Sequence, residues 1–190
     1  MRAALLILAA GESRRLGTPK QLLRVEGRSL LRRAAEEACA SAAEDVIAVL
    51  GSGAPRMREE LRGLRVRTVD NGAWREGIAS SIRTGLGAVA PGADCVLIAV
   101  CDQPRLARAH IDALIAAADA APGRAVASFY GGAPGVPACF PRALFGDLLA
   151  LTGDTGAKRV LEAQGEHLVT VDWPAGILDI DSARDIPAAV

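Results

Sequence analysis

Apolar and polar positions alternate in blocks, and each block has the length of one strand or one helix. Four short apolar runs predict buried strands, at residues 3–9, 46–50, 64–69 and 94–100. Polar segments with helix-start signals lie between them: Ser29 can cap a helix to about Ala40, Pro55 opens a charged helix, and another helix ends near Val89. This alternation predicts an α/β protein whose parallel sheet is covered by helices on both faces.

The second half of the chain changes pattern. Residues 125–129 and 136–140 predict two strands joined by a glycine-rich hairpin loop at 130–135. Three helices are expected: one begins near Leu106, one begins after Pro141 and runs to about Leu149, and one runs to Gln164 from a cap at Thr152 or Asp154. Two further strands are expected, at 167–171 and 177–181.

Length and charge narrow the possible functions. We expect residues 1–190 to form a single domain, since the chain supports one substantial core. Formal net charge is zero, with 22 basic and 22 acidic side chains, which argues against nucleic-acid binding. The four cysteines form no C-x-x-C pair, so neither a zinc site nor a disulfide framework is indicated. No apolar run is long enough to cross a bilayer, and no signal-peptide pattern is present, so we expect a cytoplasmic protein without membrane contact.

The loop after the first strand is rich in glycine and cations. It holds Gly11, Ser13, Arg14, Arg15, Gly17, Pro19 and Lys20. Glycine allows close approach of the backbone to a ligand, and Arg and Lys supply positive charge, so the loop suits a triphosphate. The alternative is a charged surface turn. The glycine spacing matches neither of the common phosphate-binding motifs.

A second polar segment follows the third predicted strand. Asn71, Ser80 and Ser81 can hydrogen-bond a base or ribose, and Trp74 offers a flat apolar face. Alternatively, Ser80 or Ser81 caps the following helix and Trp74 packs in the core.

Acidic residues follow two of the predicted strands. Asp102 comes just after the strand at 94–100, at the edge of the sheet where ligands of such folds bind. Mg²⁺ takes one or two carboxylates together with phosphate oxygens, so Asp102 is a candidate ligand. The alternative is that Asp102 caps the next helix. Asp179 and Asp181 would share one side of the last strand, and one of them could complete the metal site. His110 is expected at the surface without a role.

Motifs from Leu8 to Asp185 together resemble one family, the molybdenum-cofactor nucleotidyltransferases. The residues that match its L-A-x-G-x-S-x-R-x-G-x-x-K-x-L signature are Leu8, Ala9, Ala10, Gly11, Ser13, Arg15, Gly17, Lys20 and Leu22. Further matches are the N-x-x-W-x-x-G-x-x-S-S segment at 71–81, D-x-P at 102–104, G-D-x-G-A-K at 153–158 and D-I-D-S-x-x-D at 179–185. The resemblance implies a three-layer α/β/α, Rossmann-like (GT-A-like) nucleotidyltransferase fold with a mostly parallel central sheet.

The resemblance also implies roles for these residues. Arg15 and Lys20 would act on the phosphates. The nucleotide site would comprise Leu8, Ala9, Ala10, Gly11, Lys20, Asn71, Ser80 and Ser81. Asp154, Gly156 and Lys158 would bind the acceptor phosphate, and Mg²⁺ would lie on Asp102 and Asp181, with Asp179 as the alternative.

The similarity is greatest to the cytidylyltransferase branch, because Ala10 replaces a glycine typical of the guanylyl branch and would crowd a purine. The implied reaction transfers CMP from CTP to the terminal phosphate of molybdopterin and releases pyrophosphate, with a molybdoenzyme or its chaperone as a possible partner. Two alternatives stay open: a guanylyltransferase or another small-molecule nucleotidyltransferase of this fold, and a non-catalytic cofactor-delivery protein.

Overall fold

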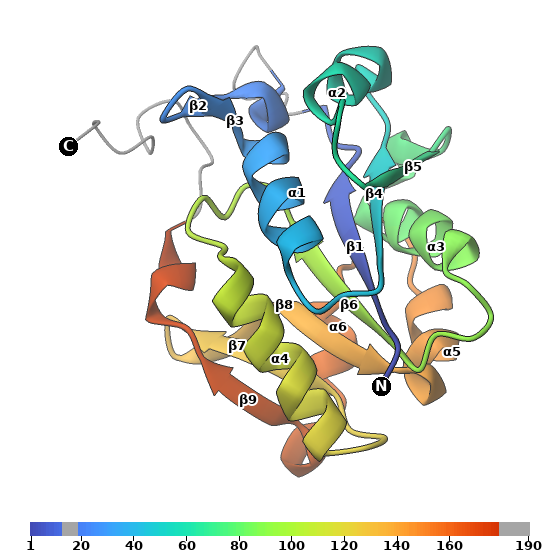
Figure 1. Ribbon diagram of the computed structural model, residues 1–190. Coiled ribbons are helices and arrows are strands. Elements are labelled where there is room, and N and C mark those ends of the chain that lie inside the picture. The colour runs from blue at the N-terminus through green and yellow to red at the C-terminus, as the bar shows by residue number, and fades with distance from the viewer. Residues whose placement is uncertain (13–18, 179–190) are drawn as a thin grey trace.

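Seven strands form one sheet in the computed structural model, which describes residues 1–12 and 19–178 (Figure 1). Their order across the sheet is β5 (Arg67–Asp70), β4 (Asp45–Leu50), β1 (Ala3–Ala9), β6 (Cys95–Val100), β8 (Ala133–Pro141), β7 (Val126–Tyr130) and β9 (Val169–Asp172). Strand β8 is antiparallel to both neighbours, and the other pairs are parallel. The mostly parallel sheet is therefore confirmed.

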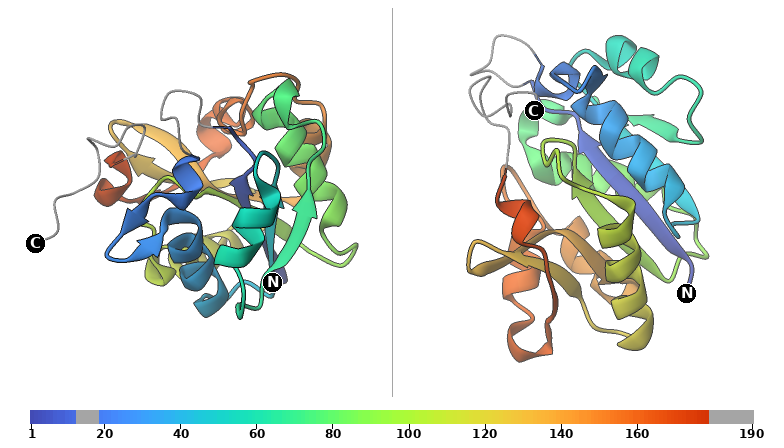
Figure 2. Two further views of the ribbon diagram at one scale, coloured as in Figure 1. Left: turned by 90° about the horizontal axis from the view of Figure 1, so that it is seen from above. Right: turned by 60° about the vertical axis from the view of Figure 1, so that its left-hand side comes forward.

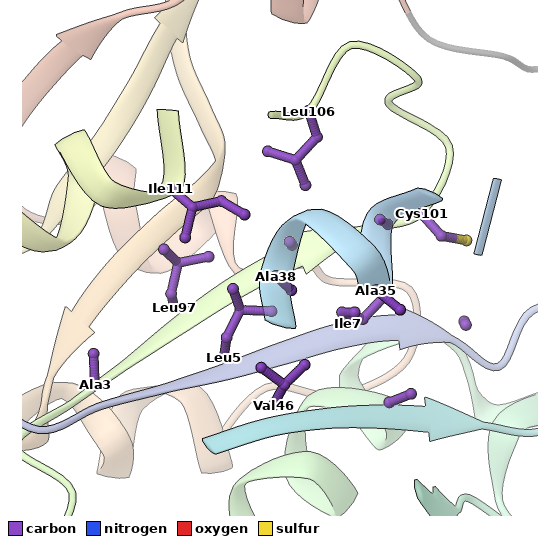
Figure 3. Close-up of a cluster of buried hydrophobic side chains, with 14 of the residues drawn as sticks. Ala3, Leu5, Ile7, Ala35, Ala38, Val46, Leu97, Cys101, Leu106 and Ile111 are labelled. Carbon is purple, nitrogen blue, oxygen red and sulfur yellow. The ribbon is translucent and has the colours of Figure 1, made fainter. Parts of the chain in front are cut away.

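Helices cover both faces of this sheet, which confirms the three-layer prediction. Helices α1 (Leu30–Ala40), α2 (Ala54–Glu60) and α4 (Arg108–Ala120) contribute to one buried cluster. Helices α3 (Ile78–Ala88), α5 (Phe145–Leu149) and α6 (Lys158–Glu162) contribute to the other. Figure 3 shows part of the first cluster, in which Leu5 and Leu97 point to the side of the sheet that carries Ala38 and Ile111.

Strand β1 lies in the interior of the sheet and is buried on both faces. All seven of its residues are buried, because it pairs in parallel with β4 on one side and β6 on the other. Leu5 and Ile7 face one helical layer, whereas Leu6 and Leu8 face the other. A strand buried on both faces has no polar alternation, so its sequence is continuously apolar.

Several element boundaries differ from the predictions. The third strand begins at Arg67 rather than at 64, because the turn at 61–63, where Gly63 has a φ of +83°, continues as a bend through 64 and 65. Helix α6 begins at Lys158 with Ala157 as its N-cap, so neither Thr152 nor Asp154 caps it. The expected helix after Pro141 is a 3-10 turn, Arg142–Leu144, followed by α5. The last predicted strand, 177–181, lies mostly outside the described residues.

Short elements without a clear apolar pattern were missed. Two of them, β2 (Arg24–Val25) and β3 (Arg28–Ser29), form a small hairpin before α1. Within the described part of the chain there are four more 3-10 turns: η1 (Lys20–Leu22), η2 (Trp74–Glu76), η4 (Gly165–His167) and η5 (Pro174–Ile177). Helix α1 was predicted correctly, and the Ser29 hydroxyl accepts a hydrogen bond from the Arg32 amide as its cap.

His110 is buried, so its predicted surface position was wrong. It is 9% exposed, and its ring stacks on Trp173 at 4.6 Å between centroids. Its Nε2 lies 2.7 Å from the Ser128 hydroxyl, which itself donates to the Pro137 carbonyl oxygen at 2.6 Å. Because that hydroxyl proton is already used, Nε2 must carry the proton and donate. Burial lowers the pKa of His110 to about 4.

We therefore expect His110 to make the protein acid-sensitive. The neutral ring is favoured in the folded state, whereas the unfolded chain takes up a proton below its ordinary pKa of about 6.5. Stability should thus be lost as the pH falls from about 6.5 toward 4, by roughly 2 to 3 kcal/mol. Urea unfolding at several pH values measures this loss. The His110→Gln variant should lose less over this range, and His167→Gln, which replaces the other histidine, should follow the wild type. Parallel curves for His110→Gln and wild type would contradict the assignment.

The carboxyl ends of β1, β4, β5 and β6 lie at one end of the molecule, opposite the end marked N (Figure 2).

Among the described residues, no helix has both the length and the apolar character needed to span a bilayer.

Candidate active site

A cavity of about 390 Å³ opens where β1 and β6 end. Its walls come from the segment after β1, the η2 and α3 region, the end of β6 and the loop before α6. The lining residues are Leu8, Ala10, Gly11, Glu12, Lys20, Gln21, Trp74, Arg75, Gly77, Ile78, Ser81, Val100, Cys101, Asp102 and Asp154. Ligands of open parallel sheets bind at such an edge.

Lys20 and Asp102 meet in this cavity, although 82 positions separate them in the chain. The Lys20 Nζ donates directly to Asp102 Oδ2. Asp102 is 8% exposed, and its other oxygen, Oδ1, is buried with no hydrogen-bond partner among the described residues. The alternative role of Asp102 as a helix cap is wrong, because Ala107 is the N-cap of α4. A buried carboxylate oxygen without a donor suits a cation.

Gln21 holds the backbone of the segment after β1. It is 2% exposed, and its Nε2 donates to the carbonyl oxygens of Ala9 at 3.0 Å and Gly11 at 2.7 Å. The side chain therefore fixes the backbone beside Lys20. Sequence reasoning missed this residue, because its partners are 10 and 12 positions away.

The predicted nucleotide residues after β5 separate into two groups. Asn71 is 2% exposed, and its Nδ2 donates to the hydroxyls of Ser80 at 2.8 Å and Ser81 at 3.0 Å. The Ser80 hydroxyl donates to the Gly77 carbonyl oxygen at 2.8 Å. The helix-cap alternative is wrong, since Gly77 is the N-cap of α3 and no side chain caps that end. Ser81 lines the cavity, whereas Asn71 and Ser80 lie behind its wall and brace it.

Trp74 lies in the cavity wall rather than in either buried cluster. The Arg75 guanidinium lies over its ring, 4.3 Å from the centroid. This cation–π contact leaves an aromatic surface and a positive charge at the same rim of the cavity.

Gly77 joins two walls of the cavity. Its φ of +121° and ψ of −177° belong to a region that is essentially restricted to glycine. A Cβ at this position would lie 2.4 Å from the Gly153 carbonyl carbon and 2.5 Å from Asp154 Oδ1. The Ala79 amide donates to the Gly153 carbonyl oxygen at 3.1 Å, so the start of α3 and the loop at 152–156 are in direct contact.

We expect Gly77→Ala to separate these walls. The clash involves backbone atoms, so one segment must move, and the strained dihedrals add to the cost. Together these effects should lower the free energy of unfolding by about 3 kcal/mol. Nucleotide-induced stabilisation should also weaken, because Asp154 and Ser81 line the cavity on either side of the contact. Chemical denaturation and thermal shift with a nucleotide measure the two effects.

Gly72→Ala is the matched control, since a Cβ there meets no atom within 4 Å. It should change neither quantity appreciably. Equal behaviour of the two alanine variants would show that the Gly77 contact is unimportant.

A second cavity of about 320 Å³ lies beyond Asp102, on the hairpin side of the sheet. It is lined by Gln103, Tyr130, Gly131, Ala133, Pro134, Gly135, Lys158, Gly176 and Ile177. The Gln103 amide nitrogen donates to the Val136 carbonyl oxygen at 3.0 Å and to the Tyr130 hydroxyl oxygen at 3.2 Å. The two predicted acceptor residues Asp154 and Lys158 thus line different cavities.

Asp102 is the predicted metal ligand that lies within the described residues. Asp179, Asp181 and Arg15 lie outside the described residues. Within residues 1–12 and 19–178, no group of three or more His, Cys, Asp or Glu side chains forms a metal cluster. Asp102 with its buried Oδ1 still fits Mg²⁺, because this ion commonly uses one or two carboxylates and completes its shell with water and phosphate oxygens.

Comparison with known proteins fits this geometry. Residues 5–168 match the family described as the MobA-like NTP transferase domain. The chain belongs to this family. The resemblance inferred from the motifs is thereby confirmed, and the chain is a nucleotidyltransferase.

Individual curated proteins and solved structures are similar to this chain. The purine catabolism protein PucB of Bacillus subtilis (strain 168) is 33% identical over 86% of this chain and 83% of its own. Nicotine blue oxidoreductase of Paenarthrobacter nicotinovorans is 36% identical over 57% of this chain, and the match spans 53% of that relative's length. The crystal structure of Rv0371c from Mycobacterium tuberculosis H37Rv is 30% identical with a TM-score of 0.83, covering 97% of this chain and 95% of that one. The crystal structure of a manganese complex of the same protein is 29% identical with a TM-score of 0.77, covering 97% of this chain and 96% of that one.

Proposed function

We propose that this nucleotidyltransferase transfers CMP from CTP to the terminal phosphate of molybdopterin, with Mg²⁺, and releases pyrophosphate. The observation that carries the proposal is the direct contact of Lys20 with Asp102 in the cavity at the ends of β1 and β6. A cation for phosphates and a carboxylate for a divalent ion are the groups that such a transfer requires.

The chain's own groups would act by positioning and by charge. An acceptor phosphate oxygen attacks the α-phosphorus in line, and the bond to the pyrophosphate oxygen breaks. Lys20, together with Arg15, would bind the phosphates and stabilise the negative charge that develops on them. Asp102, with Asp181 or Asp179, would hold Mg²⁺, which supplies charge neutralisation when bound. No nucleophilic side chain is needed.

The base would lie between the end of β1 and the start of α3. Leu8, Ala10, Gly11 and Ser81 line that part of the cavity, while Ala9, Asn71 and Ser80 support it from behind. The Ala10 carbonyl oxygen accepts a hydrogen bond from the Ser52 amide at 3.1 Å, which fixes the Ala10 methyl group in place. Ala10 lines the cavity, and a methyl group in place of a glycine hydrogen supports selection of the smaller pyrimidine base.

The acceptor would occupy the second cavity and extend toward Asp102. Lys158 lines the second cavity and can attract an anionic group there. Asp154 lines the first cavity, and a Cβ at Gly156 would lie 3.8 Å from Ile78, which also lines the first cavity. Because Asp102 and Gln103 are adjacent and line the two cavities, the two substrates would meet at the end of β6.

A pyrophosphate-release assay with each of the four nucleoside triphosphates tests this proposal. With Mg²⁺ and molybdopterin present, CTP should support release and the other nucleotides much less. Preference for GTP would make the protein a guanylyltransferase, and activity with a different acceptor phosphate would change the substrate. Binding of nucleotide without release under any of these conditions would favour a delivery partner of a molybdoenzyme.

A further inference from the structure

The two carboxylate oxygens of Asp102 have different surroundings. Oδ1 is buried, and Oδ2 receives the Lys20 ammonium. Lys20 is itself partly buried, with 26% of its side chain exposed. A divalent ion that arrives from solvent therefore meets Lys20 at the accessible side of the carboxylate.

We infer that Lys20 holds the metal position on Asp102 until the phosphates of a nucleotide withdraw it, so that nucleotide and divalent ion bind cooperatively. This inference rests on the proposed role of Asp102 as a metal ligand. An ammonium group and a divalent cation repel each other on one carboxylate, and either ion satisfies its charge. The Lys20 ammonium and the divalent ion therefore cannot both occupy Oδ2 of Asp102.

A triphosphate offers Lys20 an alternative partner. Lys20 lines the cavity proposed for the nucleotide, and its flexible four-carbon stem can reorient a compact charge without moving the backbone. Gln21, the next residue, is anchored to the carbonyl oxygens of Ala9 and Gly11, which keeps the base of that stem in place. The ammonium can thus turn from carboxylate to phosphate.

This exchange couples the two ligands. A nucleotide that draws Lys20 away exposes the carboxylate to the ion, and by reciprocity the ion favours the nucleotide-bound position of Lys20. The nucleotide-free enzyme should accordingly bind free divalent ions weakly. Removing the Lys20 charge should strengthen that binding, although it damages phosphate binding.

Mn²⁺ titration without nucleotide, followed by the EPR signal of the free ion, tests the inference. Lys20→Met should bind Mn²⁺ about tenfold more tightly than wild type. In wild type the ion must break the charge-assisted hydrogen bond between Lys20 and Asp102, whereas the variant has no such bond to break. Lys20→Arg retains the cation and should not gain affinity. Lys158→Met is the matched control, since lysine occurs at only these two positions, and it should resemble wild type. Asp102→Asn should lose the site.

Unchanged or weaker binding by Lys20→Met, or an equal gain in Lys158→Met, would overturn the inference. If Asp102→Asn binds as wild type does, the proposed metal role of Asp102 fails as well. If Asp102→Asn loses the ion while Lys20→Met gains nothing, only the exchange fails.

A second measurement uses the wild-type protein, so it does not depend on a variant folding. Lysine labelled with ¹³C at Cε gives two side-chain signals, which Lys158→Arg assigns. Adding CTP without divalent ion should shift the Lys20 signal. An unmoved Lys20 signal at saturating CTP would contradict the exchange.

Discussion

Replacing Asp102 with asparagine is expected to lower nucleotidyl transfer about 1000-fold or more, the scale of several kcal/mol supplied by a bound metal ion. Asparagine keeps the size of the side chain but removes the negative charge, so it cannot hold Mg²⁺ in the same way. The fold should persist, because Asp102 lies at the end of β6 and its hydrogen bond is to a partly exposed lysine. Pyrophosphate release over a Mg²⁺ series measures the loss.

Asp147→Asn is the matched control for this variant. It removes the same charge from an exposed position on α5, and Asp147 lines neither cavity. Its activity and Mg²⁺ dependence should match wild type. An Asp102→Asn enzyme with the wild-type Mg²⁺ dependence would show that the ion binds elsewhere.

Replacing Lys20 with alanine is expected to lower turnover about 100-fold or more, the loss typical of removing one preorganised charge donor. Lys20 is placed by η1 and by the neighbouring Gln21, so its ammonium is held in the cavity before the nucleotide arrives. The effect should appear in kcat as well as in KM, because charge on the phosphates grows during transfer. Steady-state kinetics with CTP measures both.

Lys20→Arg tests whether charge alone suffices. Arginine keeps the charge but has a planar, bidentate geometry, so it should recover only part of the activity. A rate near that of wild type for Lys20→Ala, with the fold intact, would remove Lys20 from the chemistry.

The sheet was predictable from local pattern, and the meeting of Lys20 with Asp102 was predictable from that sheet together with the family motifs. Continuous apolar runs identified β1 and β6, and the parallel arrangement then brought the residues after both strands to one edge. Asp102 closely follows β6. Lys20 comes after a longer loop, which Gln21 ties back to Ala9 and Gly11, so its pairing with Asp102 was expected from the family resemblance as well as from the strand order.

Other features depend on contacts that no local pattern encodes. The contact of Gly77 with the loop at 153–154 joins segments about 76 positions apart, and its need for glycine is visible only once both backbones are placed. The position of His110 early in a helix suggested an exposed side chain. In the structure, Ser128 of β7 and Trp173, which follows β9, contact its ring and bury it. Tertiary packing decided these positions rather than helical periodicity.

The central claim is that Lys20 and Asp102 serve one nucleotide–metal complex, and crystals soaked with CTP and Mn²⁺ test it most directly through anomalous diffraction. The account predicts a manganese peak on the Asp102 carboxylate, with the triphosphate in the same cavity and the Lys20 ammonium turned onto a phosphate oxygen. A triphosphate bound in that cavity with manganese absent from Asp102, or a nucleotide bound in another region of the molecule, would contradict it.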